Sequence, residues 1–179
     1  MPKTLISTHT PSGVGTLDIT SGINSTYRAY ALHYYNFRPA TNQVDLTFQV
    51  NADGESGFNE TATSSFYYTQ RGENPSHGSG TAYYASMDVA NQGVYIPLNY
   101  EVGSVTEEST SGVLWLFNPS STVFQTHFLS ESNFAQSDDY AGCAFVGGYF
   151  HTTDAITQIS FKFDSGNIAV GTMKLFGVS

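Results

Sequence analysis

Histidine and cysteine are the residues of this 179-residue chain best suited to metal binding or proton transfer, and they are scattered along it. The five histidines are His9, His33, His77, His127 and His151. No two stand at the short spacing of zinc ligands, and Cys143 is the single cysteine. Its apolar neighbours, residues 144–146, predict a small buried side chain rather than a nucleophile. We expect no bound metal and no cofactor.

The fifteen carboxylates are numerous enough for acid–base chemistry, but no motif pairs them. Asp53, Glu55 and the adjacent pairs 107–108 and 138–139 could supply oxygen ligands to calcium, yet the EF-hand spacing is missing. Glycoside hydrolysis needs an acid and a partner carboxylate about 5–10 Å apart, and the sequence cannot place any two together. The sequence also lacks nucleophile-elbow, Walker A, dinucleotide-binding and zinc-protease motifs. We interpret the acids as solvated loop residues and predict a protein that is not an enzyme.

Tyrosine offers more specific candidates, because its flat apolar ring and its hydroxyl suit both sugar stacking and protein interfaces. Adjacent tyrosines at 67–68 and at 83–84 flank residues 71–80, a polar segment rich in Gly and Pro that predicts an exposed loop. Tyr83, Tyr84 and Tyr95 are therefore candidate interface or glycan contacts. Core packing, subunit contact and ligand contact all remain open for them.

Charge and composition exclude several partners. Six basic residues against fifteen acidic ones give a formal net charge of −9, which disfavours binding to nucleic acid. No run of apolar residues is long enough for a membrane span or a secretory signal, so we expect a soluble protein made in a cytoplasm. Charged residues make up only 12% of the chain, and 12 Tyr and 13 Phe favour strands over helices.

Three segments predict strands with distinct environments. Residues 27–38 carry aromatic side chains on both alternating faces, which predicts a strand covered on both sides. Residues 44–50 alternate with period two, so their odd-numbered residues should face solvent. Residues 113–117 are apolar on both faces, which predicts a central strand in which Trp115→Ala costs roughly 3–5 kcal/mol.

Three further segments predict an edge strand, a bulged strand and a hairpin. Pro97 removes a backbone donor and argues for an edge strand. Residues 140–150 contain three glycines and predict a strand with a bulge. Residues 155–178 predict a closing hairpin, with a turn at residues 164–167 and a bulge at Gly171.

Together these patterns predict a single all-β domain, an antiparallel β-sandwich of about eight strands that is jelly-roll-like. Residues 1–16 contain Pro and Gly among Ser and Thr without periodicity, and predict an extended N-terminal arm. We expect residues 17–179 to form the sandwich domain.

Three segments also carry a resemblance. The strand that ends in Pro39-Ala40-Thr41, the strand and turn over residues 112–121, and the closing segment 156–178 resemble a family of small all-β proteins common in tailed-phage genomes. Phe176 and Val178 stand where that family has Tyr and Ile. The resemblance covers most of the chain beyond residue 25, and its motifs are turns and core positions.

The resemblance implies a non-enzymatic virion structural protein, made in the host cytoplasm and located in the virion. A compact domain with an arm and without a fibrous stem favours capsid decoration on the particle exterior. The alternative is a tail-fibre or receptor-binding sandwich that recognises host surface glycans. The implied partners are further copies of the chain, with a trimer as one candidate, the major capsid protein and a host glycan.

Overall fold

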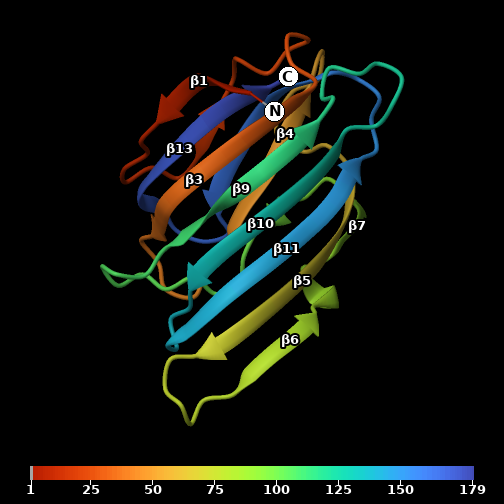
Figure 1. Cartoon of the computed structure of the whole chain (residues 1–179). Helices are drawn as coiled ribbons and strands as arrows, with labels where there is room; N and C mark the ends of the chain where they lie inside the picture. The colour runs from red at the N-terminus through yellow and green to blue at the C-terminus, as the bar shows by residue number, and fades with distance from the viewer. Residues whose placement is uncertain (1) are drawn as a thin grey trace.

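The computed structural model describes residues 2–179, and two antiparallel β-sheets account for its architecture (Figure 1). The large sheet has nine strands, eight of them in the order β1 (Lys3–His9), β13 (Ile168–Val178), β3 (Ala29–Pro39), β9 (Thr110–Phe117), β10 (His127–Ala135), β11 (Tyr140–Phe150), β5 (Ala62–Gly72) and β6 (Ser79–Tyr83). The ninth, β7 (Val89–Gln92), also pairs with β5. The small sheet has the order β2 (Leu17–Ile19), β12 (Ile156–Phe163), β4 (Leu46–Ala52) and β8 (Ile96–Pro97).

The predicted all-β antiparallel sandwich is confirmed, although thirteen strands rather than about eight are found over residues 2–179. A single turn of 3-10 helix, η1 (Ala85–Met87), interrupts them. In the described range no helix has the length and apolar character needed to cross a membrane.

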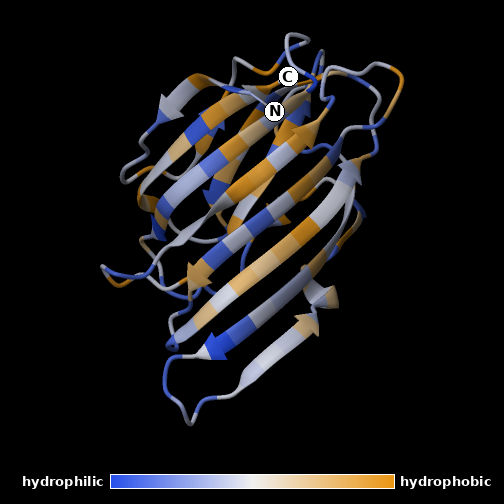
Figure 2. Cartoon of the chain, in the orientation of Figure 1, coloured by the Kyte–Doolittle hydropathy of each residue, from blue (hydrophilic) through white to orange (hydrophobic). Residues whose placement is uncertain are grey.

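The core lies where the small sheet packs behind the large one. Phe48 of β4 stands at its centre, with ring centroids 5.1 Å from Phe128, 6.2 Å from Phe150 and 6.3 Å from Phe161. These rings come from both sheets, because strand residues of one parity face inward. Figure 2 shows the same alternation as bands of differing hydropathy along the strands.

The closing segment does not form the predicted hairpin. β12 lies in the small sheet between β2 and β4, whereas β13 lies in the large sheet between β1 and β3. Residues 164–167 therefore carry the chain from one sheet to the other. Two strands with one apolar face each can pack face to face as well as side by side, and their periodicity is the same in both cases. The irregularity predicted near Gly171 is confirmed, since the pairing with β3 shifts register on both sides of Val170.

The odd-numbered residues of β4 were expected to face solvent, and this prediction is wrong. Thr47 and Gln49 are only 3% and 0% exposed. The Gln49 carboxamide donates hydrogen bonds to the carbonyl oxygens of Glu60, at 3.0 Å, and Val94, at 2.7 Å. Loops therefore cover the outer face of the small sheet at this point. The edge position predicted from Pro97 is confirmed, because β8 ends the small sheet.

β3 also differs from its prediction, because its outer side is open to solvent at Tyr35. Tyr30, Leu32 and Tyr34 face the core, but Tyr35 points outward and is 41% exposed. Asn36 has a positive φ of 51°, and the pairing with β9 shifts register between Tyr34 and Phe37. This bulge turns Phe37 back into the core, so simple alternation assigned it to the wrong face.

β9 is central as predicted, with β3 on one side and β10 on the other. Its Trp115, however, is half-buried and lies on the outer face, opposite in parity to the buried Leu114 and Leu116. β11 has no bulge, because its pairings with β10 and β5 are unbroken. The glycine at position 142 allows close packing rather than a bulge, since a Cβ there would collide with the Phe134 ring.

The N-terminal segment, expected to be an extended arm, is hydrogen-bonded into the large sheet. β1 pairs with β13 from Lys3, opposite Val178, to His9, opposite Met173. The Lys3 ammonium lies 4.7 Å from the centroid of the Trp115 ring, where a cation–π contact adds to the strand pairing.

Candidate functional site

The outer face of the large sheet carries many exposed apolar side chains. They include Leu5, Tyr35, Tyr67, Phe117, Leu129 and Phe145. Exposed apolar side chains that gather on one face mark interaction sites more often than single exposed residues do. The outer face is therefore the first place to look for a function.

Charge is distributed unevenly between this sheet and the rest of the molecule. Of the fifteen acidic residues, only Glu131 lies within a strand of the large sheet. Four of the six basic residues lie in those strands, at Lys3, Arg38, Arg71 and Lys174. The chain thus places its acids in loops and in the small sheet, and keeps the large sheet free of negative charge apart from Glu131.

Two rows of side chains run across the strands on the outer face. The first, the aromatic row, consists of His33, Val113, Glu131, Phe145, Tyr67 and Tyr83, each paired with the next on adjacent strands. Its Phe145 and Tyr67 rings have centroids 6.1 Å apart. Because side chains repeat on one face every second residue, a parallel row lies about 7 Å away.

The second row, the polar row, consists of Ser111, Asn133, Cys143, Thr69 and Thr81, again paired strand by strand. The Thr81 hydroxyl donates to the Thr69 hydroxyl at 3.3 Å, which donates to the Gly80 carbonyl at 3.1 Å. A line of hydroxyl and amide groups therefore borders the aromatic row.

Cys143 was predicted to be buried in the core, but it is half-exposed and belongs to this row. Its parity is opposite to that of the buried Ala144, a distinction that apolar neighbours alone cannot reveal. Burial, with a smaller contribution from the Glu131 charge, raises the pKa of its thiol, so the thiol is not an activated nucleophile.

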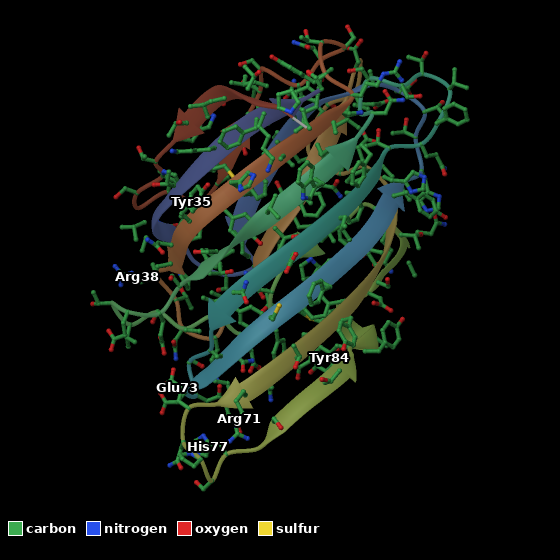
Figure 3. All side chains as sticks on the ribbon, in the orientation of Figure 1. Tyr35, Arg38, Arg71, Glu73, His77 and Tyr84 are labelled. Carbon is green, nitrogen blue, oxygen red and sulfur yellow. The ribbon has the colours of Figure 1, made fainter. Side chains whose placement is uncertain are left out.

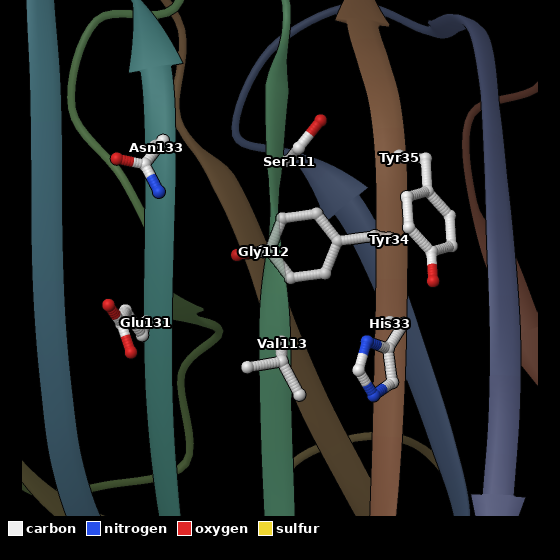
Figure 4. A pocket seen from close by; sticks show the side chains of 8 residues that line it. All are labelled: His33, Tyr34, Tyr35, Ser111, Gly112, Val113, Glu131 and Asn133. Carbon is white, nitrogen blue, oxygen red and sulfur yellow. The ribbon is translucent and has the colours of Figure 1, made fainter.

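A shallow hollow of about 280 Å³ lies at the β3 end of the two rows (Figure 4). His33 and Tyr35 stand on one side, and Glu131 and Asn133 on the other. The His33 and Tyr35 rings are nearly parallel, with an interplanar angle of 17° and centroids 6.3 Å apart. Two aromatic rings on β3 thus stand across β9 from a carboxylate and an amide on β10.

Gly112 and the β3 bulge shape this hollow. A Cβ at Gly112 would come within 2.6 Å of the Tyr34 hydroxyl, so only glycine lets the Tyr34 ring pass beneath β9. The Ser111 hydroxyl accepts a hydrogen bond from the Asn36 amide at 2.9 Å, which holds the bulge against β9.

His33 is a neutral ring in this setting. Burial, followed by the nearby Lys3 charge, lowers its pKa. The Lys3 ammonium lies 3.0 Å from His33 Nε2 and donates to it. The imidazole therefore offers a ring face to a ligand near pH 7 rather than a positive charge.

A second hollow, of about 290 Å³, shares Asn133 with the first. It continues along the polar row past Cys143 and Thr69 to Arg71 and Ser79. Figure 3 shows Tyr35 on β3 and Arg71 near the end of β5, towards the opposite edge of the sheet. We call these two adjacent hollows, which together run from Tyr35 on β3 to Ser79 on β6, the trough.

The three tyrosines singled out from the sequence lie in three different places. Tyr83 belongs to the aromatic row, is 63% exposed and donates its hydroxyl to the Asp88 carboxylate. It also lines a third hollow of about 420 Å³ on the same face, with Tyr149. Tyr84 is half-buried on the inner side, where its hydroxyl lies 3.2 Å from that of Tyr100.

Tyr95 lies on the small sheet and not near the trough. Its hydroxyl donates to the Ser160 hydroxyl at 3.0 Å, and the Lys162 ammonium lies 4.2 Å from its ring centroid. It lines a hollow of about 400 Å³ with Asp45 and Asp164. Burial is the main cause that raises the Asp45 pKa to about 7, and the charges of Asp164 and Glu101 add to it.

The trough residues Tyr35, Asn133 and Glu131 were not identified from the sequence. Each stands in an ordinary alternating strand, and only the register between strands brings them together. Asn36, next to Tyr35, has a positive φ that marks the bulge, and no sequence motif predicts this backbone conformation.

No group of three or more His, Cys, Asp or Glu residues within residues 2–179 is arranged to hold a metal ion. Comparison with protein-family models, with curated proteins and with solved structures finds no match to this chain.

Proposed function

We propose that this protein is a non-enzymatic virion structural protein of a tailed phage that recognises host surface glycans through the trough. The observation that carries the proposal is the side-by-side arrangement of the aromatic row and the polar row on an uncovered sheet face. Sugars present both apolar C–H faces and hydroxyl groups, and aromatic rings beside amides and hydroxyls complement both. The phage context comes from the sequence resemblance.

Capsid decoration was favoured by the sequence, largely because of the expected arm. The residues that would form that arm pair with β13 instead, and Gly13 is tied to the Ile168 carbonyl at 2.8 Å. The arm therefore no longer favours decoration over host recognition, and the trough supports recognition.

Binding of the purified chain to a glycan array, together with gold-labelled antibody on intact particles, tests the proposal. We expect glycan binding and label confined to the tail. The absence of any glycan hit, with label spread over the head, would contradict glycan recognition.

Capsid decoration is the second candidate, and a different part of the same face supports it. Leu5, Trp115, Phe117 and Leu129 form apolar surface beyond the trough, and such surface suits contact with the major capsid protein or with further copies of the chain. Light scattering of the purified protein and a pull-down with capsids test this role. A strict monomer that never associates with heads would exclude it.

A further inference from the structure

We infer that the trough binds interior segments of an uncharged polysaccharide that lies across the strands, from Tyr35 on β3 towards β6. This inference rests on the glycan recognition proposed above. It adds the ligand class, the direction of the chain and the residues that select it.

The length and form of the trough indicate a polymer. Five inter-strand steps separate β3 from β6, and at about 4.8 Å each they span about 24 Å. The two hollows are shallow and adjacent, since Asn133 lines both. A closed pocket would select a chain end or a single sugar, whereas a shallow trough of this length accommodates several sugars of an unbroken chain.

The lining of the trough changes along its length. His33 and Tyr35 present ring surface in the first hollow, where the C–H face of a sugar can stack. Asn133 and Thr69 present hydrogen-bonding groups in the second, and the Asn133 carboxamide can both donate and accept. Asn133 borders both hollows, so a polysaccharide that fills the trough must run past the Asn133 side chain.

Charge selects against anionic chains. Glu131 stands beside the first hollow together with the Lys3 ammonium that is bound to His33, and Arg71 stands beside the second, so the charges along the trough are single and of both signs rather than a basic cluster. The molecule as a whole carries a formal charge of −9, and the resulting field repels a polyanion at long range. An uncharged polysaccharide meets no such penalty.

Cys143 provides a direct test because it is the one cysteine of the chain and lines the second hollow. The probes are dextran, mannan and galactan as uncharged polymers, and polysialic acid and alginate as anionic ones. Alkylation of Cys143 by N-ethylmaleimide is followed with and without each probe at slightly alkaline pH. Calorimetry then measures the affinity for oligosaccharides of increasing length from the best probe.

We expect an uncharged polymer to slow alkylation and to bind more tightly as its chain lengthens, up to the span of the trough. Asn133→Ala and Tyr35→Ala should each weaken binding by about tenfold, the loss of one or two good contacts. Leu129→Ala is the matched control, since it removes an exposed side chain from the same strand as Asn133 outside the trough. It should leave the affinity within about twofold, and equal melting temperatures would show that all three variants fold.

Three results would overturn the inference, and they can be told apart. Glycan binding that neither protects Cys143 nor responds to Asn133→Ala would place the site elsewhere while leaving glycan recognition intact. Tighter binding of the anionic polymers would refute the ligand class. Binding to none of the probes or array glycans would overturn the inference and the proposed function together.

Discussion

The outer faces of the two sheets are built by the same strand alternation but meet different surroundings. On the small sheet, the outward-pointing Gln49 is fully buried because the backbone at Glu60 and Val94 lies over it and accepts its hydrogen bonds. On the large sheet, the outward-pointing Tyr35 and Asn133 face an open hollow. An outward-pointing polar residue that loops cover therefore has a structural role. One that loops leave open is a candidate for binding.

The hydrogen-bond partners on the small sheet support this distinction. Tyr95 donates to Ser160, and Ser160 donates to the Asp18 carboxylate at 2.6 Å, so this chain of groups is satisfied within the protein. Substitutions on the small-sheet face should thus change stability, and substitutions along the trough should change binding.

The largest stability loss should come from the core that both faces share. Phe48→Ala removes a fully buried ring that contacts aromatic side chains of both sheets, and should lower the free energy of unfolding by about 3–5 kcal/mol. Urea unfolding followed by fluorescence measures the loss. The exposed Leu129→Ala should stay within about 0.5 kcal/mol, and similar losses for both variants would mean that the large-sheet face is covered.

Asp45 should make the stability of the small-sheet side depend on pH. Its pKa rises from 3.8 to about 7 on folding, so the folded state binds the proton more tightly than the unfolded chain. The resulting stabilisation is complete below about pH 4 and is lost as the pH rises towards 7, by up to about 4 kcal/mol.

Asp45→Asn isolates this effect, because the amide keeps an oxygen that can accept the Glu101 amide hydrogen bond of 2.7 Å. The variant should match the wild type in acid and be the more stable protein above pH 7, as thermal melts across the pH range would show. Parallel melting curves at every pH would mean that Asp45 titrates normally.

Gln49→Ala should destabilise the protein by about 2 kcal/mol, because it removes a fully buried carboxamide together with its hydrogen bonds to two backbone carbonyl groups. Asn133→Ala is the comparison on the open face and should cost less than about 0.5 kcal/mol. Chemical denaturation of both variants measures the difference. A larger loss for Asn133→Ala would reverse the roles assigned to the two faces.

The sequence predicts the fold class and individual strands because alternation is a local property. It predicts the central position of β9 and the edge position of Pro97 for the same reason. The trough could not be predicted, since Asn133 meets Ser111 and Cys143 only through strand register. Register depends on non-local pairing, which one sequence does not encode in any short motif.

Coverage of a strand face by loops is equally non-local. The pattern around Gln49 and the pattern around Tyr35 both alternate, yet one outward face is buried and the other is open. The wrong assignments of Cys143 and of the closing hairpin have the same origin, because apolar alternation does not say which sheet or which face receives a side chain.

Trp115→Ala should have a smaller effect than Phe48→Ala or Gln49→Ala, but a more discriminating one. A central strand alone predicts a loss of about 3–5 kcal/mol for Trp115→Ala, but the ring is half-buried on the outer face and contacts the Lys3 ammonium and the Phe117 ring. We expect about 1–2 kcal/mol, of which the cation–π contact supplies about 0.5–1 kcal/mol. A double-mutant cycle with Lys3→Met separates that contact from the rest, because methionine keeps the length of the side chain without its charge. A loss above about 3 kcal/mol would show that another layer covers this part of the large sheet in solution, and the face would then serve assembly rather than glycan recognition.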